Sequence, residues 1–181
     1  MERLLRSYIM EHPAMLDDLR HVRELELPDG YVAAGYIRNY VWDRLHHDDI
    51  RSAHNDVDVV YYDPNILGEE RDRILEQSLI AATGNGKWSV KNQARMHMRN
   101  KETAYTSVED ALSRWPETAT AIGIRLEWND ELSICCPYGL DDLFNMIVRR
   151  SPLFADRAYY LKRIADKRWK QLWPSLTIIE D

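Results

Sequence analysis

A short run of the chain reads Asn55-Asp56-Val57-Asp58-Val59-Val60-Tyr61-Tyr62. Its β-branched and aromatic residues favour a strand, in which successive side chains point to opposite faces. Val57, Val59 and Tyr61 would then face a core, while Asp56 and Asp58 would share the other face. Two neighbouring carboxylates repel each other, and proteins usually offset this repulsion with a divalent metal ion bound between them. The stretch therefore predicts a strand that carries a metal site.

Size and composition are those of a globular protein. The chain has 181 residues, of which 45% are hydrophobic and 30% are charged, as in ordinary soluble domains. We expect a single domain over 1–181, with helical segments over 1–27 and 140–173 packed on its core. The net charge of −6 disfavours extensive nucleic-acid binding, because proteins that grip the phosphate backbone are usually basic. A small phosphorylated ligand needs only a local cluster of Arg and Lys.

Two features bear on the cellular compartment. Cys135 and Cys136 are adjacent, a spacing that rarely forms a disulfide and lacks the histidines of a zinc site. We expect both to be buried strand residues in a reducing compartment. The N-terminus carries Glu2, Arg3 and Arg6 within its apolar pattern, unlike a signal peptide, and no stretch approaches a membrane-spanning length. The sequence predicts a cytoplasmic protein without a membrane partner.

Hydrophobic periodicity and turn residues predict the order of the elements. Helices are expected over 4–9, 15–22, 36–46, 69–82, 107–115, 140–148 and 160–172. Strands are expected over 31–34, 56–62, 88–96, 121–127 and 132–136, the last two forming a hairpin. Ser107 is expected to cap its helix, with Asp110 three residues later. The fold class is therefore α/β (α+β), a mixed β-sheet with flanking helices.

A second feature precedes the aspartate pair. The strand over 31–34 ends at Gly35 and leads into a helix, whose first N–H groups have no intrahelical acceptor and attract phosphate. Arg38 lies in the first turn, where a cation opposes the helix dipole; an anion such as a triphosphate would resolve that conflict. Asn39 can donate a hydrogen bond to the same oxygens. The alternative is that Gly35 is an ordinary loop residue and Arg38 pairs with Asp43 or another neighbour.

Two further groups of polar residues have competing interpretations. Four side chains would share one face of the strand predicted over 88–96, namely Lys91, Gln93, Arg95 and His97. They would form a strip for nucleotide or acceptor binding, or else a solvated sheet edge. The stretch His46-His47-Asp48-Asp49 contains metal-binding residue types, but adjacent ligands on a loop rarely converge on one ion, so a solvated loop is favoured.

The order of strand, glycine, helix, loop and Asp-x-Asp strand resembles the DNA polymerase beta-like nucleotidyltransferase superfamily. At the family level the chain is similar to a small bacterial nucleotidyltransferase family, from about Leu27 to Trp173. The resemblance is carried by the segments Ala34-Gly35-Tyr36-Ile37-Arg38-Asn39-Tyr40-Val41-Trp42-Asp43, Asn55-Asp56-Val57-Asp58-Val59, Lys91-Asn92-Gln93-Ala94-Arg95-Met96-His97, Trp115-Pro116-Glu117-Thr118-Ala119-Thr120 and Tyr138-Gly139-Leu140-Asp141-Asp142-Leu143.

The resemblance implies a polymerase beta-like core with C-terminal helices that performs two-metal nucleotidyl transfer. Asp56 and Asp58 would be catalytic and would hold Mg²⁺ (or Mn²⁺). An unknown acceptor hydroxyl would attack the α-phosphorus of an NTP in line, and pyrophosphate would leave. The N–H groups of Gly35 and Tyr36, with Arg38, would hold the β- and γ-phosphates. The other nucleotide-binding residues would be Asn39, Lys91, Asn92 and Arg95.

The chain departs from the superfamily pattern at two places. Tyr36 follows Gly35, where the superfamily often has a second glycine or a serine. The strand after the aspartate pair usually supplies a third carboxylate, but here it offers Lys91, Asn92 and Gln93. Four acids elsewhere could fold back, and we favour a structural role for each: Glu117, Glu127, Asp141 and Asp142. The alternative function is a catalytically impaired nucleotide-binding sensor or interaction module.

Overall fold

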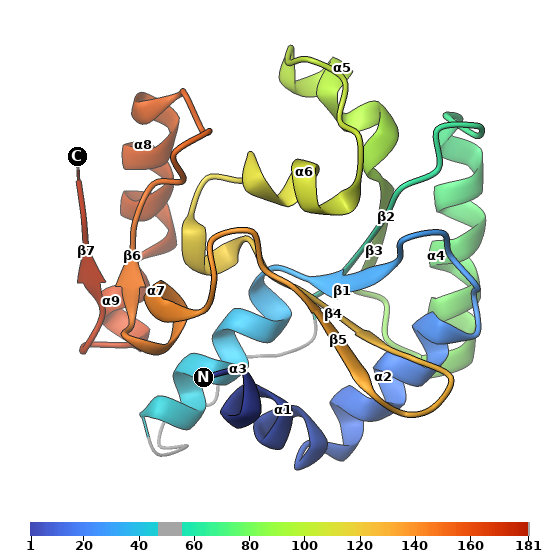
Figure 1. Ribbon diagram of the computed structural model, residues 1–181, viewed down its shortest axis with the longest axis horizontal. Helices are drawn as coiled ribbons and strands as arrows, with labels where there is room; N and C mark the ends of the chain where they lie inside the picture. Colours follow the sequence, from blue (N-terminus) through green and yellow to red (C-terminus); the bar gives the residue numbers. More distant parts are fainter. Residues whose placement is uncertain (47–55, 181) are drawn as a thin grey trace.

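A five-stranded mixed sheet forms the centre of the protein. The computed structural model describes residues 1–46 and 56–180 (Figure 1). The strands are β1 (Tyr31–Ala33), β2 (Val57–Tyr61), β3 (Trp88–Asn92), β4 (Gly123–Leu126) and β5 (Leu132–Cys135). Their order in the sheet is β3-β2-β1-β4-β5. Only β2 and β3 run parallel among these neighbouring pairs, so the predicted mixed sheet with flanking helices is confirmed.

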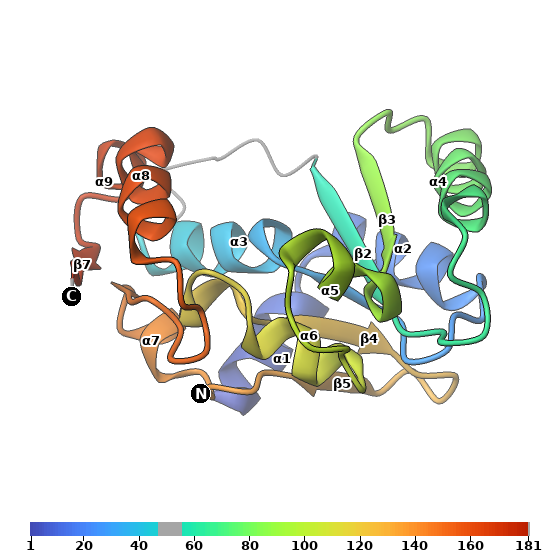
Figure 2. The ribbon, with the colours of Figure 1, turned by 90° about the horizontal axis from the view of Figure 1, so that it is seen from above.

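Helices surround this sheet (Figures 1 and 2). They are α1 (Glu2–Met10), α2 (Pro13–Arg23), α3 (Gly35–Leu45), α4 (Glu69–Thr83), α5 (Met96–Asn100), α6 (Val108–Ser113), α7 (Asp141–Phe144), α8 (Arg157–Lys167) and α9 (Trp169–Leu172), with 3₁₀ turns η1 (Gln93–Arg95) and η2 (Thr118–Thr120). Figure 2 shows α4 at one end of the molecule and α8 and α9 at the other, with α3 running toward them. A parallel pair, β6 (Ile147–Val148) and β7 (Thr177–Ile178), forms a second small sheet.

The alternation predicted for the Asp-x-Asp strand is present. Val57, Val59 and Tyr61 are at most 1% exposed and belong to the main apolar cluster, which also holds buried residues of α1, α2 and α3. Val60 points to the opposite face, where it joins a smaller cluster with residues of α6. Asp58 has the same parity as Val60 and is only partly buried. The strand thus buries Val57, Val59 and Tyr61 in the main core, and Asp58 lies on the opposite face of the sheet, where α6 packs.

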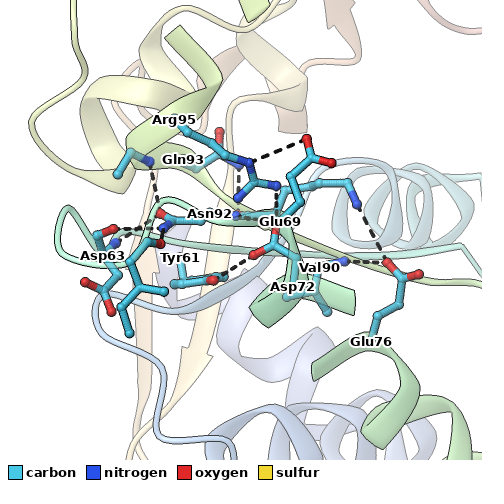
Figure 3. A network of polar contacts seen from close by, with 12 residues as sticks. Tyr61, Asp63, Glu69, Asp72, Glu76, Val90, Asn92, Gln93 and Arg95 are labelled. Atoms are coloured by element: carbon cyan, nitrogen blue, oxygen red, sulfur yellow. Dashed lines mark hydrogen bonds and ion pairs between the residues drawn. The ribbon is translucent and has the colours of Figure 1, made fainter. Parts of the chain in front are cut away.

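Acidic side chains of α4 cover the outer edge of β3 (Figure 3). The N–H of Val90 donates to Glu76 at 3.2 Å, and the N–H of Asn92 donates to Asp72 at 3.1 Å. Asp72 also accepts from the Tyr61 hydroxyl at 2.7 Å and from the Arg95 guanidinium. A sheet edge with unpaired N–H groups is a template for unwanted pairing, so these carboxylates both satisfy the edge and protect it.

Residue Asn92 ends β3 earlier than the sequence predicted. Its side-chain oxygen accepts from the N–H groups of Asp63 and Ala94 at 3.0 and 3.1 Å, and the second contact starts the 3₁₀ turn η1. The predicted strand over 88–96 is therefore wrong beyond Asn92. The expected strip of Lys91, Gln93, Arg95 and His97 on one strand face is wrong for the same reason, because the chain is helical from Gln93 onward.

The C-terminal part also differs from its prediction. The helix expected over 140–148 stops at Phe144 as α7, and Met146 adopts a positive φ of 55°, which turns the chain into β6. The helix expected over 160–172 starts at Arg157 and is interrupted at Arg168, whose φ is 48°. Left-handed backbone in a residue other than glycine breaks a helix, and helical periodicity does not reveal it.

Other local predictions agree with the structure. The hairpin joins β4 and β5, with Asp130 in the left-handed region, and the Ser107 hydroxyl accepts from the N–H of Asp110 at 3.0 Å.

Cys135 and Cys136 are free but only half-buried, so the expectation that both are buried is wrong. Partial burial still raises the pKa of Cys135 to about 12. No helix in the described ranges is both long and apolar enough to cross a membrane. The stretch 47–49 lies outside the described residues.

Candidate active site

A cavity of about 220 Å³ opens between β2, the start of α3 and α8. It is lined by Ala34, Gly35, Tyr36, Arg38, Asn39, Asp56, Asp58, Thr120, Arg163 and Lys167. Six of these residues were predicted from the sequence to form one site: Gly35, Tyr36, Arg38, Asn39, Asp56 and Asp58. The fold thus brings the helix start and the aspartate pair to one hollow, although they come from different segments of the chain.

The two aspartates differ in their surroundings. Asp56, which directly precedes β2, is exposed, and its carboxylate lies 3.6 Å from the Lys87 ammonium. Burial raises the pKa of Asp58, repulsion from Asp56 raises it further, and a hydrogen bond from the Ser89 side chain opposes both effects. Arg38 and Lys167 also lower the pKa of Asp58 but leave the net shift upward, so a further cation at this point would favour the charged carboxylate. Carboxylate oxygens of this kind suit Mg²⁺ or Mn²⁺, which take one or two carboxylates together with substrate phosphates and water.

The start of α3 presents backbone N–H groups to the cavity. The Arg38 N–H donates to the Ala34 carbonyl at 3.1 Å, so Gly35 and Tyr36 precede the first intrahelical bond and have no acceptor within the helix. The Tyr36 side chain is buried, and its hydroxyl donates to Asp18 on α2. The bulky residue after Gly35 therefore turns its ring away and contributes backbone to the cavity.

Arg38 is a buried cation at the cavity wall. It is 4% exposed and donates to the Thr120 hydroxyl and the Asn39 side-chain oxygen, each at 2.7 Å. Its guanidinium carbon lies 5.0 Å from the Trp42 ring centroid and 4.6 Å from that of Trp169, distances typical of cation–π contacts. Burial lowers its pKa to about 10, and the nearby Glu117 opposes that shift, so Arg38 stays protonated near neutral pH.

No carboxylate in the described part of the chain forms an ion pair with Arg38. The alternative partner Asp43 instead accepts a hydrogen bond from the Trp173 indole at 2.7 Å. The guanidinium lies close to Gly35, since a Cβ there would be 3.4 Å from Arg38 Nη2, which is a van der Waals contact. The Asn39 oxygen is occupied by Arg38, which leaves its amide N–H groups for another acceptor. Glu117 and Asp58 favour the charged form of Arg38 without forming an ion pair with it, and an anion in the adjoining cavity could pair with it directly.

Sequence reasoning missed the contribution of α8. Arg163 and Lys167 lie one helical turn apart and line the cavity, and the Lys167 ammonium helps to lower the pKa of Asp58. Arg163 donates to the buried Glu117 carboxylate at 2.5 Å, whereas Lys167 is exposed. Their i,i+4 spacing was the available signal, but it does not distinguish them from a solvated helix face such as the one that carries Lys162.

Three predicted nucleotide-binding residues lie elsewhere. Asn92 is fully buried and donates to the carbonyls of Asp63 and Ile66, each at 2.8 Å. Arg95 pairs with Asp72 in the network at the edge of β3 (Figure 3). Lys91 lies 3.7 Å from Glu76 and borders a neighbouring cavity. The structure does not bring Asn92 or Arg95 into the cavity of the aspartate pair.

A third acid does not reach the pair from the part of the chain that the structure describes. Within those residues, no group of three His, Cys, Asp or Glu side chains is placed to hold a metal ion. The acids considered from the sequence have other partners or positions: Glu117 binds Arg163, Glu127 binds Arg125 and Ser133, Asp142 binds Thr118 and Arg149, and Asp141 is exposed in the first turn of α7.

Comparison with known families gives a direct result. A nucleotidyltransferase family model matches residues 20–178. The chain belongs to this nucleotidyltransferase family. The NMR structure of a protein described as revealing a CCA-adding enzyme head domain is 33% identical, with a TM-score of 0.84, and the match covers 97% of this chain and 94% of that chain. The predicted membership of a nucleotidyltransferase family with a polymerase beta-like fold is confirmed.

More distant structures share the fold alone. A CCA-adding enzyme in complex with CTP is 16% identical, with a TM-score of 0.60, over 96% of this chain and 41% of that chain. The Thermotoga maritima CCA-adding enzyme complexed with tRNA is 17% identical, with a TM-score of 0.59, over 96% of this chain and 42% of that chain. The nucleotidyltransferase chain thus spans about two fifths of these two proteins. Comparison with curated proteins gave no match.

Proposed function

We propose that this nucleotidyltransferase moves an NMP from an NTP to an acceptor hydroxyl and releases pyrophosphate. Asp56 and Asp58 would hold the divalent metal, Mg²⁺ or Mn²⁺. When bound there, the metal would neutralise phosphate charge and favour ionisation of the acceptor hydroxyl. Membership of the family and the shared cavity of the predicted residues support this proposal.

The protein's own groups bind and orient the triphosphate. The N–H groups of Gly35 and Tyr36, at the positive end of α3, would donate to phosphate oxygens. Arg38 offers a guanidinium that is already fixed by Thr120 and Asn39, so little side-chain entropy is lost when it binds phosphate. Lys167 on α8, which also lines the cavity, would contact the same oxygens. Together these groups would hold the leaving pyrophosphate in line with the aspartate pair.

The buried Arg38 is the single observation that carries the phosphate assignment. Its guanidinium is 4% exposed, lies beside a helix N-terminus and forms no direct ion pair among the described residues, although Glu117 and Asp58 favour its charged form; it is therefore available to a phosphate in the cavity. Asp56 and Asp58 line the same cavity, and a divalent metal ion bound to the triphosphate would offset the repulsion between these carboxylates and the phosphates. The observation favours a metal–triphosphate complex over a metal or an anion alone.

A coupled assay tests the proposal. Binding of each of the four NTPs is measured with Mg²⁺ or Mn²⁺, and each mixture is then incubated with a panel of hydroxyl acceptors while pyrophosphate release is followed. Since similar structures are CCA-adding enzymes, RNA 3′ ends belong in the panel beside small molecules and proteins. Metal-dependent pyrophosphate release that requires both the NTP and one acceptor would support the proposal; absence of NTP binding with either metal would refute it.

One observation favours a second function. In the described ranges no third carboxylate reaches Asp56 and Asp58, and loss of a general base typically slows a reaction by about 10²–10⁴-fold. A nucleotide-binding module with impaired catalysis would retain the phosphate cradle and the metal pair. It would bind NTP in a metal-dependent manner and release no pyrophosphate with any acceptor, which the same assay would reveal.

A further inference from the structure

A second cavity, of about 280 Å³, adjoins the first. The two share Ala34, Asp58, Thr120 and Arg163 in their walls. The remaining walls of the second cavity are Val59, Val60, Lys91, Gln93, Met96, Asn100, Trp115, Pro116 and Tyr159. We name this second cavity the aromatic lobe. Arg38 and Lys167 line only the first cavity. The aromatic lobe is instead lined largely by apolar and aromatic side chains.

Large apolar side chains form much of the aromatic lobe. Trp115 follows α6, is half-buried and packs against the smaller apolar cluster. Met96 at the start of α5 and the half-exposed Tyr159 on α8 complete these walls. Aromatic and thioether groups at a nucleotide site provide stacking surfaces, because every nucleobase has a π-face.

Gln93 supplies the polar group. It is 4% exposed, and its side-chain nitrogen donates to the Lys91 carbonyl at 3.2 Å. This bond fixes the orientation of the carboxamide. Its oxygen has no hydrogen-bond donor among the described residues and belongs to a side chain that lines the aromatic lobe. This oxygen is not among the fully buried atoms that lack a partner, so it remains accessible, and an N–H group of a planar heterocycle in the lobe could donate to it.

The sheet register places this lobe at a suitable distance from the aspartates. Asp58 pairs with Ser89, and Lys91 lies two residues farther along β3, which is about 7 Å along a strand. Gln93 follows Lys91 at the end of the strand. The aromatic lobe therefore extends from Asp58 in one direction along β2 and β3, while the phosphate-binding helix start lies on the other side.

We propose that the aromatic lobe is a nucleobase-binding site, with stacking on Trp115 and a hydrogen bond to the Gln93 oxygen. The inference rests on the proposed function, which places the reacting phosphate at Asp58. The base would belong either to the NTP or to the terminal nucleotide of an acceptor. Both sources offer the same planar heterocycle, and they are separated by the ligands used in the test.

The test compares ligands with and without a base by isothermal titration calorimetry in the presence of Mg²⁺. Wild-type protein and the variants Trp115→Leu, Trp115→Phe and Gln93→Met are titrated with each NTP and with inorganic tripolyphosphate. A dinucleotide is titrated in the presence of saturating tripolyphosphate. Trp128→Leu is the matched control, because Trp128 is 66% exposed and lies outside the lobe.

A base from the NTP predicts that NTP binds more tightly than tripolyphosphate. Trp115→Leu would then weaken NTP binding about 5- to 150-fold, as expected for one stacked base, and leave tripolyphosphate unchanged. Trp115→Phe would restore much of the loss, Gln93→Met would weaken the best-bound NTP, and Trp128→Leu would have no effect. A base from the acceptor predicts the same pattern for the dinucleotide instead of the NTP.

The contradicting outcomes are distinct. If NTP and tripolyphosphate bind equally well and the Trp115→Leu variant binds every ligand as the wild type does, the aromatic lobe is not a base site, although the phosphate site stands. If neither NTP nor tripolyphosphate binds wild-type protein, both the proposed function and this inference are wrong.

Discussion

At the residue scale, Arg38 illustrates how one position combines structural and functional roles. It lies in the first turn of α3, where its charge opposes the helix dipole. Trp42, Trp169, Thr120 and Asn39 surround it with favourable contacts. These contacts make the cation tolerable without an ion pair from the described residues, and they hold it at the cavity. Glu117 and Asp58 favour its charged form without a direct ion pair, and we infer that the substrate supplies the anion that binds it directly.

Replacement of Arg38 tests this inference. Arg38→Met keeps an apolar stem between the tryptophans and removes the charge. Because hydrogen bonds to charged groups contribute about 1.5–3 kcal/mol, NTP affinity should fall about 10- to 150-fold in calorimetric titrations with Mg²⁺. Arg44→Met, on the same helix and bound to Glu11 at the surface, is the control. Equal affinity in wild type and Arg38→Met would remove Arg38 from the phosphate site.

The site residues that were predicted correctly are those whose positions follow from simple backbone geometry. Alternation along a strand placed Asp56 and Asp58, and the helix-start rule placed Gly35 and Arg38. Long-range contacts were beyond such rules: Lys167 arrives from α8, and Asn92 is occupied by the carbonyls of Asp63 and Ile66. The i,i+4 spacing of Arg163 and Lys167 is shared with solvated helix faces, and the buried contacts of Asn92 have no local signature in the sequence.

At the element scale, the contact between α4 and β3 depends on a buried charge pair. Asp72 and Arg95 have side chains that are 2% and 8% exposed, and Asp72 also accepts from Tyr61 and the Asn92 N–H. The network connects the edge of the sheet to η1 and α5 (Figure 3). Arg95 pairs with Asp72 through Nη2 and lies 3.9 Å from Glu69 through Nε, while its Nη1 has no partner among the described residues; the two ion pairs indicate a structural role for Arg95.

Breaking this pair should destabilise the fold. Asp72→Ala leaves the Arg95 charge buried without its closest partner, a change that typically costs about 3–5 kcal/mol. Urea unfolding should show that loss, whereas Glu70→Ala, at an exposed position of the same helix, should change stability by less than about 0.5 kcal/mol. NTP affinity of the folded Asp72→Ala protein should be unchanged. Unaltered stability with weakened NTP binding would instead place the network in the nucleotide site.

The elements were predicted best where their signal was local. Periodic apolar residues located the long helices α3 and α4, and turn residues located the hairpin of β4 and β5. The errors fell where a side chain or one backbone angle redirects the chain. Asn92 starts η1 through its side-chain cap, and the positive φ of Met146 leads to β6. A periodic pattern contains neither kind of information.

At the scale of the whole molecule, tryptophans attach the C-terminal segment to α3. The Trp42 ring contacts those of Trp169 and Trp173, with centroids 5.9 and 5.1 Å apart. The Trp173 indole also donates to Asp43. This attachment positions α8, whose Arg163 and Lys167 line the cavity. The C-terminal segment therefore both closes the core and completes the site.

Removing one tryptophan should affect stability and binding together. Trp173 is 1% exposed, so Trp173→Ala should lower the free energy of unfolding by about 3–5 kcal/mol. It should also weaken NTP binding, because α8 would no longer be held against α3. The neighbouring Leu172 is 47% exposed, and Leu172→Ala serves as the control in unfolding and calorimetry. Full NTP affinity in Trp173→Ala under folding conditions would separate the segment from the site.

The central claim is that Asp56 and Asp58 hold the metal that brings NTP to the cavity. The most direct measurement is calorimetric titration of NTP with and without Mg²⁺ into wild-type protein, Asp56→Asn, Asp58→Asn and the control Asp130→Asn. Asp130 lies in the β4–β5 turn with a φ of 62°, which asparagine tolerates. We predict that both site variants lose the metal-dependent part of binding and that Asp130→Asn keeps it. Metal-dependent NTP binding at wild-type strength in Asp56→Asn and Asp58→Asn would contradict the account.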